Sequence, residues 1–230
     1  MTMTARSKYA DLPALMGGMT GDEKHVMAAS STVDVLWVLY DRVLDVTPDR
    51  VADPDRDRFL LSKGHGPTAY YAVLAAKGFI DPDLLAGWAE RDSPLGNHPD
   101  ATLLPGVEIG SGSLGHGLPL AVGVALGLRA QRRTKPKVVV LVGDGELDEG
   151  SNHEAIVLAG RLGLDRLTVV TIDNHSSTYG WPGGIADRFA LEGWAAATVD
   201  GRDHDQLADA FTRPHPGRPA VVVAVIEGRA

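Results

Sequence analysis

The sequence predicts an α/β fold in which a parallel β-sheet is covered by helices on both faces. Three stretches, VVVLVG (138–143), LTVVTID (167–173) and PAVVVAVIEG (219–228), are continuous apolar runs. Strands of a parallel sheet are buried on both faces and are therefore apolar throughout, whereas half-exposed strands alternate. Helical stretches separate these runs, as the crossover connections of a parallel sheet require.

The chain is predicted to form one domain. Its 230 residues, of which 44% are hydrophobic, are enough for one large core. The sequence contains no internal repeat, no low-complexity segment and no clear boundary. We therefore expect a single domain over 1–230, with 1–24 as a loosely packed N-terminal lead-in.

Each element of the first half has a local signal. Ser31 or Thr32 can cap a helix in which apolar residues recur at helical spacing. Gly78 suits the position after a helix end, and a glycine- and proline-rich loop as long as 91–117 is usually functional. The predicted elements are a helix at 31–44, a short strand at 59–61, helices at 68–78 and 81–90, the loop, and a helix at 118–133.

The second half alternates strand and helix, and Gly163 closes the first of its helices. This alternation is typical of βαβ units. The predicted elements are a strand at 138–143, a helix at 149–163, a strand at 167–173, a helix at 186–194, a strand at 195–200, a helix at 204–211 and a strand at 219–228.

Composition excludes several classes of function. The formal net charge of −8 argues against nucleic acid and anionic membranes as partners. The absence of cysteine excludes disulfides, zinc–thiolate sites and cysteine nucleophiles. Neither a signal-peptide stretch nor a run of about 18 apolar residues is present. We expect a cytoplasmic protein.

Two oxygen-bearing side chains follow neighbouring predicted strands. Asp144 ends the strand 138–143, and Asn174 ends the strand 167–173. Ligands of parallel α/β sheets bind at the carboxyl ends of strands, and Mg²⁺ prefers oxygen ligands of these types. Gly143 and Gly145 allow close backbone approach, and a helix starting near Glu149 can direct N–H groups at a diphosphate. The alternative is a simple turn in which Asp144 caps the next helix.

The residues around this pair resemble a known family. GDG at 143–145, then 28 residues (146–173), then Asn174 resembles the thiamine-diphosphate motif. GDGELDEGSNHEAIVLAGRLG is similar to the transketolase version of this motif. Further similar stretches, SKGHG (62–66), GNHPD (96–100) and GSGSLGHG (110–117), stand in family order. The resemblance runs from about residue 25 to about residue 227 and implies a thiamine-diphosphate-binding domain of the PP type.

The resemblance also implies a metal site and a cofactor site. Asp144, the Asn174 side chain and the backbone carbonyl of Ser176 would bind Mg²⁺, with Ca²⁺ or Mn²⁺ as substitutes. Glu146 is implied to contact the cofactor, with the alternative that its carboxylate only solvates the turn. The same solvating role is the expectation for Asp148. The residues implied to contact thiamine diphosphate are His65, Gly112, Ser113, Leu114, Gly143, Asp144, Gly145, Glu146, Asn174 and Thr178.

Four residues are implied to be catalytic. His65 would lie by the diphosphate and the reacting carbon, and His98 would hydrogen-bond substrate hydroxyls. Glu149 resembles the glutamate that joins a carboxylate network across the subunit interface. His25 is placed by counting back from STVD, although its context HVM departs from the family's HPG.

The other histidines have weaker assignments. His116 either contacts the cofactor loop or caps the next helix, and His153 is predicted to be structural. His175, His204 and His215 are predicted to be surface or loop residues.

One stretch departs from the family pattern. HSSTYGW follows Asp173 and Asn174, and Thr178 stands where the family has an apolar residue that packs against the cofactor rings. This part of the pocket is therefore expected to be more polar, with altered specificity.

The resemblance covers only the diphosphate-binding half of a full-length transketolase. We expect a complementary subunit with the pyrimidine-binding domain, in an α₂β₂ heterotetramer. The implied reaction transfers a two-carbon ketol unit from a ketose, or its phosphate, to an aldose. Two alternatives stay open: a component of a two-subunit thiamine-diphosphate 2-oxo acid decarboxylase or dehydrogenase, and a non-catalytic scaffold subunit.

Overall fold

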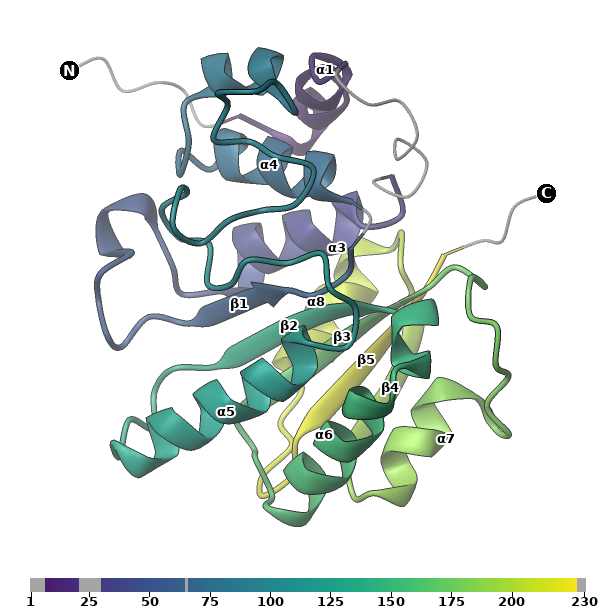
Figure 1. Ribbon diagram of the computed structural model, residues 1–230. Helices are drawn as coiled ribbons and strands as arrows, with labels where there is room; N and C mark the ends of the chain where they lie inside the picture. Colours follow the sequence, from purple (N-terminus) through teal and green to yellow (C-terminus); the bar gives the residue numbers. More distant parts are fainter. Residues whose placement is uncertain (1–6, 21–29, 65, 227–230) are drawn as a thin grey trace.

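A five-stranded parallel sheet forms the centre of the computed structural model, which describes residues 7–20, 30–64 and 66–226 (Figure 1). The strand order is β1-β2-β3-β5-β4, and every neighbouring pair is parallel. The predicted fold class is therefore confirmed. The strands are β1 (Arg58–Leu61), β2 (Val138–Gly143), β3 (Leu167–Asp173), β4 (Ala195–Asp200) and β5 (Ala220–Val225).

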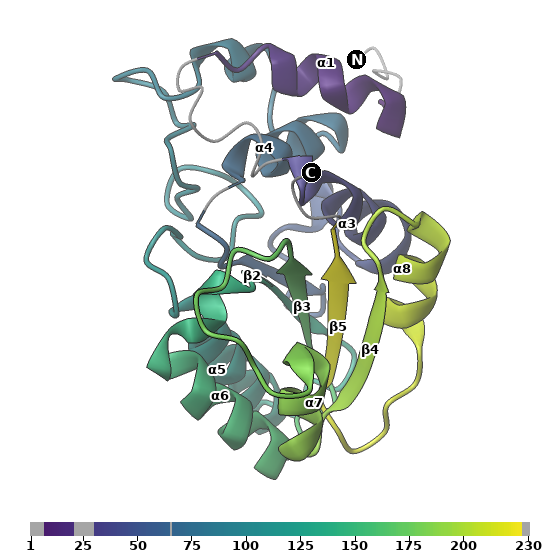
Figure 2. The same ribbon diagram turned by 90° about the vertical axis from the view of Figure 1, so that its right-hand side faces the viewer.

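Helices cover both faces of this sheet (Figure 2). Helices α5, α6 and α7 pack on one face, and α3, α4 and α8 pack on the other. Their bounds are α1 (Leu12–Gly17), α3 (Val33–Val38), α4 (Pro67–Ala76), α5 (Gly117–Ala130), α6 (Gly150–Arg161), α7 (Gly184–Leu191) and α8 (His204–Thr212). Short 3₁₀ turns lie at Tyr9–Asp11, Pro48–Arg50, Pro82–Gly87 and Gly145–Asp148, and a π-helical turn follows α3 at Leu39–Val43.

Alternate residues of the central strands enter two separate cores. In β2, Val139 and Leu141 pack with α3, α4 and α8, while Val138, Val140 and Val142 pack with α5, α6 and α7. All five side chains are at most 2% exposed. This two-sided burial is the physical reason for the unbroken apolar runs in the sequence.

The edge strand β4 has a different pattern. Its residues alternate between half-buried and exposed, and Ala196, Thr198 and Asp200 are exposed. It pairs with β5 alone among the described strands. An edge position explains why 195–200 is the least apolar of the predicted strands.

The predicted helix at 81–90 is largely wrong. Only a 3₁₀ turn forms, at Pro82–Gly87, and Trp88 then takes extended backbone angles. The Trp88 side chain is 1% exposed, and its Nε1 donates a 3.1 Å hydrogen bond to the carbonyl of Gly96. The helical segment thus ends before Trp88, whose indole is buried.

The described part of the lead-in contributes to the core. Leu12 in α1 is fully buried and Met19 is 4% exposed, and α1 lies against α4. The predicted domain limits remain predictions. Among the described residues, no helix combines the length and apolar character needed to cross a bilayer.

Candidate functional site

Asp144 lies at the carboxyl edge of the sheet, directly after β2. Gly143 pairs with Ile172, and the amide of Asp144 donates to the Ile172 carbonyl at 3.0 Å, so Asp144 stands beside the end of β3. Its buried carboxylate accepts backbone hydrogen bonds from Gly145 (2.8 Å), Ser176 (2.7 Å) and Ser177 (3.2 Å). The Ser176 hydroxyl donates a fourth, at 2.5 Å. The loop after β3 is thus folded onto this carboxylate.

Asn174 follows β3 at the same edge. Its side-chain oxygen Oδ1 is buried and has no hydrogen-bond partner among the described residues. A buried polar oxygen without a partner is costly, and in native proteins it often marks an ion or ligand position. The Ser176 carbonyl lies close to Gly145, the residue after Asp144, since a Cβ on Gly145 would lie 3.4 Å from that oxygen.

These three oxygen donors fit a magnesium ion. Mg²⁺ takes one or two carboxylate-type ligands and completes its octahedron with phosphate oxygens and water. In the described chain, no cluster of three or more His, Asp or Glu side chains could hold a metal. A carboxylate offers about four acceptor positions, and hydrogen bonds occupy all four at Asp144. A metal ion would therefore replace one hydrogen-bond donor there. The rotatable Ser176 hydroxyl is the easiest to replace.

Glu146 joins three loops beneath the site. Its carboxylate accepts from the Ser62 hydroxyl, from the Gly115 amide at 3.1 Å and from the Gly143 amide at 3.3 Å. Ser62 Oγ in turn accepts from the Gly117 amide at 3.0 Å. Burial raises the pKa of Glu146, although these hydrogen bonds act in the opposite direction. The expectation that Glu146 only solvates the turn is wrong, because it is 3% exposed.

Lys63 is a residue that the sequence analysis did not select. It is 7% exposed and lies along Gly143, where a Cβ would come within 3.4 Å of its Cγ. Burial lowers its pKa to about 8, and the charges of Asp144 and Glu146 oppose this shift. The sequence signal that could have identified Lys63 is its position inside SKGHG (62–66), which also contains the candidate His65.

Asp148 orders the loop that departs from the family pattern. Its carboxylate accepts from the Ser177 hydroxyl (3.0 Å) and from the amides of Thr178 (3.1 Å) and Tyr179 (3.4 Å). Solvation of the turn is therefore the wrong role for Asp148 as well. The bonds fix the backbone of Thr178, which is exposed.

The structure brings His98 against the segment GSGSLGHG (110–117), here called the glycine-rich loop. Gly112 has a φ of 117°, and a Cβ there would lie 2.7 Å from the His98 ring, so only glycine permits this contact. Leu114 reaches the SKGHG segment, with its Cδ2 3.1 Å from a Cβ placed on Gly64. Ser113 is exposed. Ser111 Oγ is buried without a partner in the described part, and no sequence signal pointed to it.

Of the remaining catalytic candidates, the structure describes only Glu149. His25 and His65 lie outside the described residues. Glu149 is exposed at the N-cap of α6, and Ser151 in the first turn donates to the Gly115 carbonyl at 2.6 Å. The start of α6 therefore adjoins the same glycine-rich loop.

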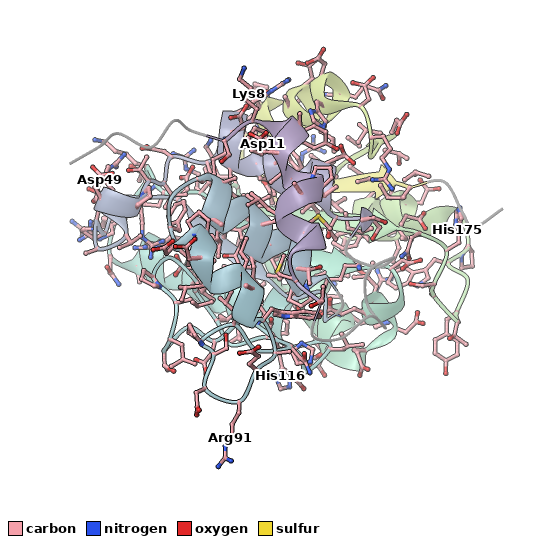
Figure 3. The ribbon with its side chains drawn as sticks, turned by 90° about the horizontal axis from the view of Figure 1, so that it is seen from above. Lys8, Asp11, Asp49, Arg91, His116 and His175 are labelled. Carbon is pink, nitrogen blue, oxygen red and sulfur yellow. The ribbon has the colours of Figure 1, made fainter. Side chains whose placement is uncertain are left out.

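Three of the other histidines have defined environments. His116 is exposed at the N-cap of α5 and makes no side-chain capping bond (Figure 3). His153 stacks on Trp181 with ring centroids 5.0 Å apart, which agrees with a structural role. His204, predicted to be a surface or loop residue, is half-buried at the first position of α8, and its Nε2 lies 2.8 Å from the buried carboxylate of Asp34.

Comparison with known proteins decides the family. Residues 20–226 match the family model described as "Transketolase, thiamine diphosphate binding domain". The chain belongs to the transketolase family. Asp144, Asn174 and the glycine-rich loop all lie inside the matched range.

Relatives of known name include further transketolase-family proteins. The chain is 39% identical to one subunit of the apulose-4-phosphate transketolase of Actinobacillus succinogenes, over 94% of this chain and 77% of that protein. The transketolase from Leishmania mexicana has the same fold, with a TM-score of 0.76 and 25% identity. That match covers 96% of this chain but only 37% of the solved chain, so this chain spans about a third of it.

A more similar relative has a different kind of name. "Ferredoxin fas2" of Rhodococcoides fascians is 60% identical over 95% of this chain and 72% of that protein. Iron–sulfur clusters are held mainly by cysteine thiolates. The 230 residues of this transketolase-family chain contain no cysteine and offer no such ligand.

Proposed function

We propose that this chain is the N-terminal subunit of a two-component transketolase. With a complementary subunit, it would transfer a two-carbon ketol unit from a ketose or ketose phosphate to an aldose. Family membership supports the reaction class. A relative matched over 77% of its length, and named as one subunit of a transketolase, supports the division into two polypeptides.

The edge formed by Asp144 and Asn174 is the observation that carries this proposal. A carboxylate and a buried amide oxygen that has no hydrogen-bond partner in the described part of the chain stand at adjacent strand ends, where α/β proteins bind their ligands. Asp144, Asn174 and the carbonyl of Ser176 would hold Mg²⁺, and the ion would hold the diphosphate. Ca²⁺ or Mn²⁺ could serve in its place.

Thiamine diphosphate, when bound, supplies the nucleophilic carbon and the electron sink for breaking the ketose C2–C3 bond. The chain's own residues would position it. Gly145 and the start of α6 would face the diphosphate, and Gly112, Ser113 and Leu114 would line the ring pocket. Lys63, buried beside Gly143, adds positive charge close to the diphosphate position.

The histidines would handle the substrate's protons. His98 is held against Gly112 by a loop whose Gly96 carbonyl accepts from Tyr71 Oη at 3.0 Å and from Trp88 Nε1 at 3.1 Å. An imidazole there can hydrogen-bond a substrate hydroxyl and carry its proton. His65 and His25 are proposed for similar tasks, and Glu149 for the carboxylate network at the interface.

The proposed partner carries the pyrimidine-binding domain, and the assembly is proposed as an α₂β₂ heterotetramer. Glu149, which is exposed at the N-cap of α6, lies on the surface available to such a partner. A cytoplasmic location remains a prediction.

Reconstitution of the chain with its complementary subunit tests the function. The pair, supplied with thiamine diphosphate and Mg²⁺, is expected to transfer two carbons between a ketose phosphate and an aldose. Neither chain alone should do so. Turnover of pyruvate in place of ketoses would assign the 2-oxo acid class instead. Failure of the folded pair to bind cofactor in calorimetry would identify a scaffold subunit.

A further inference from the structure

A cavity lies at the end of the sheet opposite to Asp144, where β2, β3 and β5 begin. Its volume is about 650 Å³, within the usual range of about 300–1,000 Å³ for small-molecule sites. Figure 2 shows the strands running upward, so this cavity is at the lower end of that view. The length of β2, six residues, separates the two ends by about 20 Å at 3.3 Å per residue.

Positive charge is concentrated in this cavity. Five basic side chains line it and only one acid, Asp165, although the whole chain carries a net charge of −8. The five come from the end of α5 and the turn after it, from the α6–β3 connection and from the turn after α8. They are Arg129, Arg133, Lys137, Arg166 and Arg213.

Two of these charges are balanced by acids. Arg133 pairs with Asp55 at 2.7 Å, and the Lys137 ammonium lies 3.8 Å from a carboxylate oxygen of Asp57. The charges of these two side chains are therefore already paired with acids that do not line the cavity.

Three guanidinium groups have no carboxylate partner in the part of the chain that the structure describes. Arg129 donates to the carbonyls of Leu162 at 2.8 Å and Gly163 at 2.7 Å, and Arg166 donates to carbonyls of the 134–135 turn. The exposed guanidinium of Arg213 makes neither a hydrogen bond nor an ion pair with the described residues. Like charges gathered in one cavity favour an anion between them.

The carbonyl contacts give the cavity preformed geometry. They hold Arg129 and Arg166 in place and leave further N–H groups of each fork available, and the guanidinium fork suits phosphate oxygens. Apolar side chains, among them Leu128, Leu164, Phe211 and Pro214, form much of the remaining wall, together with threonines and His215. A wall of this kind suits a flat or apolar molecular body.

We propose that this cavity is a binding site for a phosphorylated small molecule. The phosphate would be held by Arg213 together with Arg129 and Arg166, and the body of the molecule would lie on the apolar wall. The site is separate from the edge that carries Asp144 and does not depend on the proposed function.

Titration of the folded chain with AMP tests this site, with thiamine diphosphate and Mg²⁺ present to occupy the opposite edge. AMP carries its phosphate on a ribose that also bears a flat aromatic base, whose faces can pack on the apolar part of the wall. Arg213→Glu is expected to weaken AMP binding at least tenfold. Since the exposed Arg213 side chain makes neither a hydrogen bond nor an ion pair with the described residues, the variant should keep the wild-type melting temperature.

Arg91→Glu is the matched control. Arg91 projects into solvent from a distant turn (Figure 3), so this variant changes the net charge equally and should bind AMP as the wild type does. Inorganic phosphate is expected to bind more weakly than AMP, through the same Arg213. Equal loss of affinity in both variants, no saturable AMP binding by the wild-type chain, or phosphate binding as tight as AMP binding would overturn the proposal.

Discussion

Asn174 shows how one atom can indicate a ligand. Its Oδ1 is buried at the strand edge and has no donor among the described residues, so removing it should leave the fold intact and weaken the proposed metal site. In the reconstituted pair, Asn174→Ala is expected to reduce the affinity for thiamine diphosphate with Mg²⁺ at least tenfold, about 1.4 kcal/mol. Calorimetric titration measures this.

His175→Ala provides the control for that experiment. His175 is the next residue, and its side chain is 64% exposed. Wild-type affinity is expected in this variant. An Asn174→Ala variant with wild-type affinity would remove Asn174 from the metal site.

The buried carboxylate of Glu146 should contribute to the stability of the fold. Replacing Glu146 by alanine would leave three donors without an acceptor: the buried Ser62 hydroxyl and the amides of Gly115 and Gly143. Each unsatisfied buried donor costs about 1–3 kcal/mol, so Glu146→Ala is expected to lower the free energy of unfolding by about 2 kcal/mol or more. Urea denaturation measures this. The exposed Glu149→Ala should change it by less than about 0.5 kcal/mol, and equal effects would contradict the proposed role of Glu146.

Sequence reasoning placed Asp144 and Asn174 at one edge because strand ends are readable from apolar runs. It could not find the bond between Ser62 and Glu146, because these residues are 84 positions apart in the chain. For the same reason it placed His204 among the surface or loop residues and missed its partner Asp34, which lies 170 positions away. Hydrophobic periodicity contains no information about which distant polar groups meet.

At the scale of elements, the strands and most helices were predictable, because burial on two faces leaves a continuous apolar run and burial on one face leaves a clear period. The exception at 81–90 depended on the burial of Trp88, a tertiary contact. Helix packing also distinguishes glycines that look alike in the sequence. A Cβ on Gly160 of α6 would lie 1.9 Å from the Glu192 carbonyl oxygen, whereas a Cβ on Gly123 of α5 would meet nothing within 4 Å.

Alanine substitution at these two glycines should have opposite effects. Gly123→Ala is expected to raise the free energy of unfolding by about 0.5–1 kcal/mol, because it removes the helical penalty of glycine. Gly160→Ala should lower it by about 1–3 kcal/mol, because the α7–β4 turn must move away. Chemical denaturation of the isolated chain compares them, and a neutral Gly160→Ala would show that α6 is not packed as described.

At the scale of the whole molecule, Asp34 joins distant segments. Its carboxylate, 4% exposed, accepts from Tyr9 Oη at 2.5 Å and Arg202 Nη1 at 2.7 Å, and lies 2.8 Å from His204 Nε2. Burial opposes ionisation, yet the hydrogen bonds from Tyr9, Arg202 and His204 lower the pKa of Asp34 below its ordinary value. The first described residues are thereby tied to the start of α8.

The stability of the chain should consequently depend on acid. A carboxylate whose pKa is lowered by folding stabilises the native state above its unfolded pKa, about 3.9, and this contribution is lost as the pH falls through the folded pKa. Melting temperatures below about pH 4 should fall more steeply for the wild type than for Asp34→Asn. At neutral pH, Asp34→Asn should be less stable by about 1–3 kcal/mol. The control Asp205→Asn changes an exposed carboxylate of α8 and should follow the wild-type profile.

The strand order β3-β5-β4 also constrains the chain as it leaves the ribosome. Strand β4 is synthesised before β5, yet β5 is its only partner among the described strands, and β5 must insert between β3 and β4. Until about residue 225 has emerged, β4 has no neighbour and one side of β3 is open. Open strand edges are sites of aggregation, so the nascent chain is most vulnerable just before this last insertion.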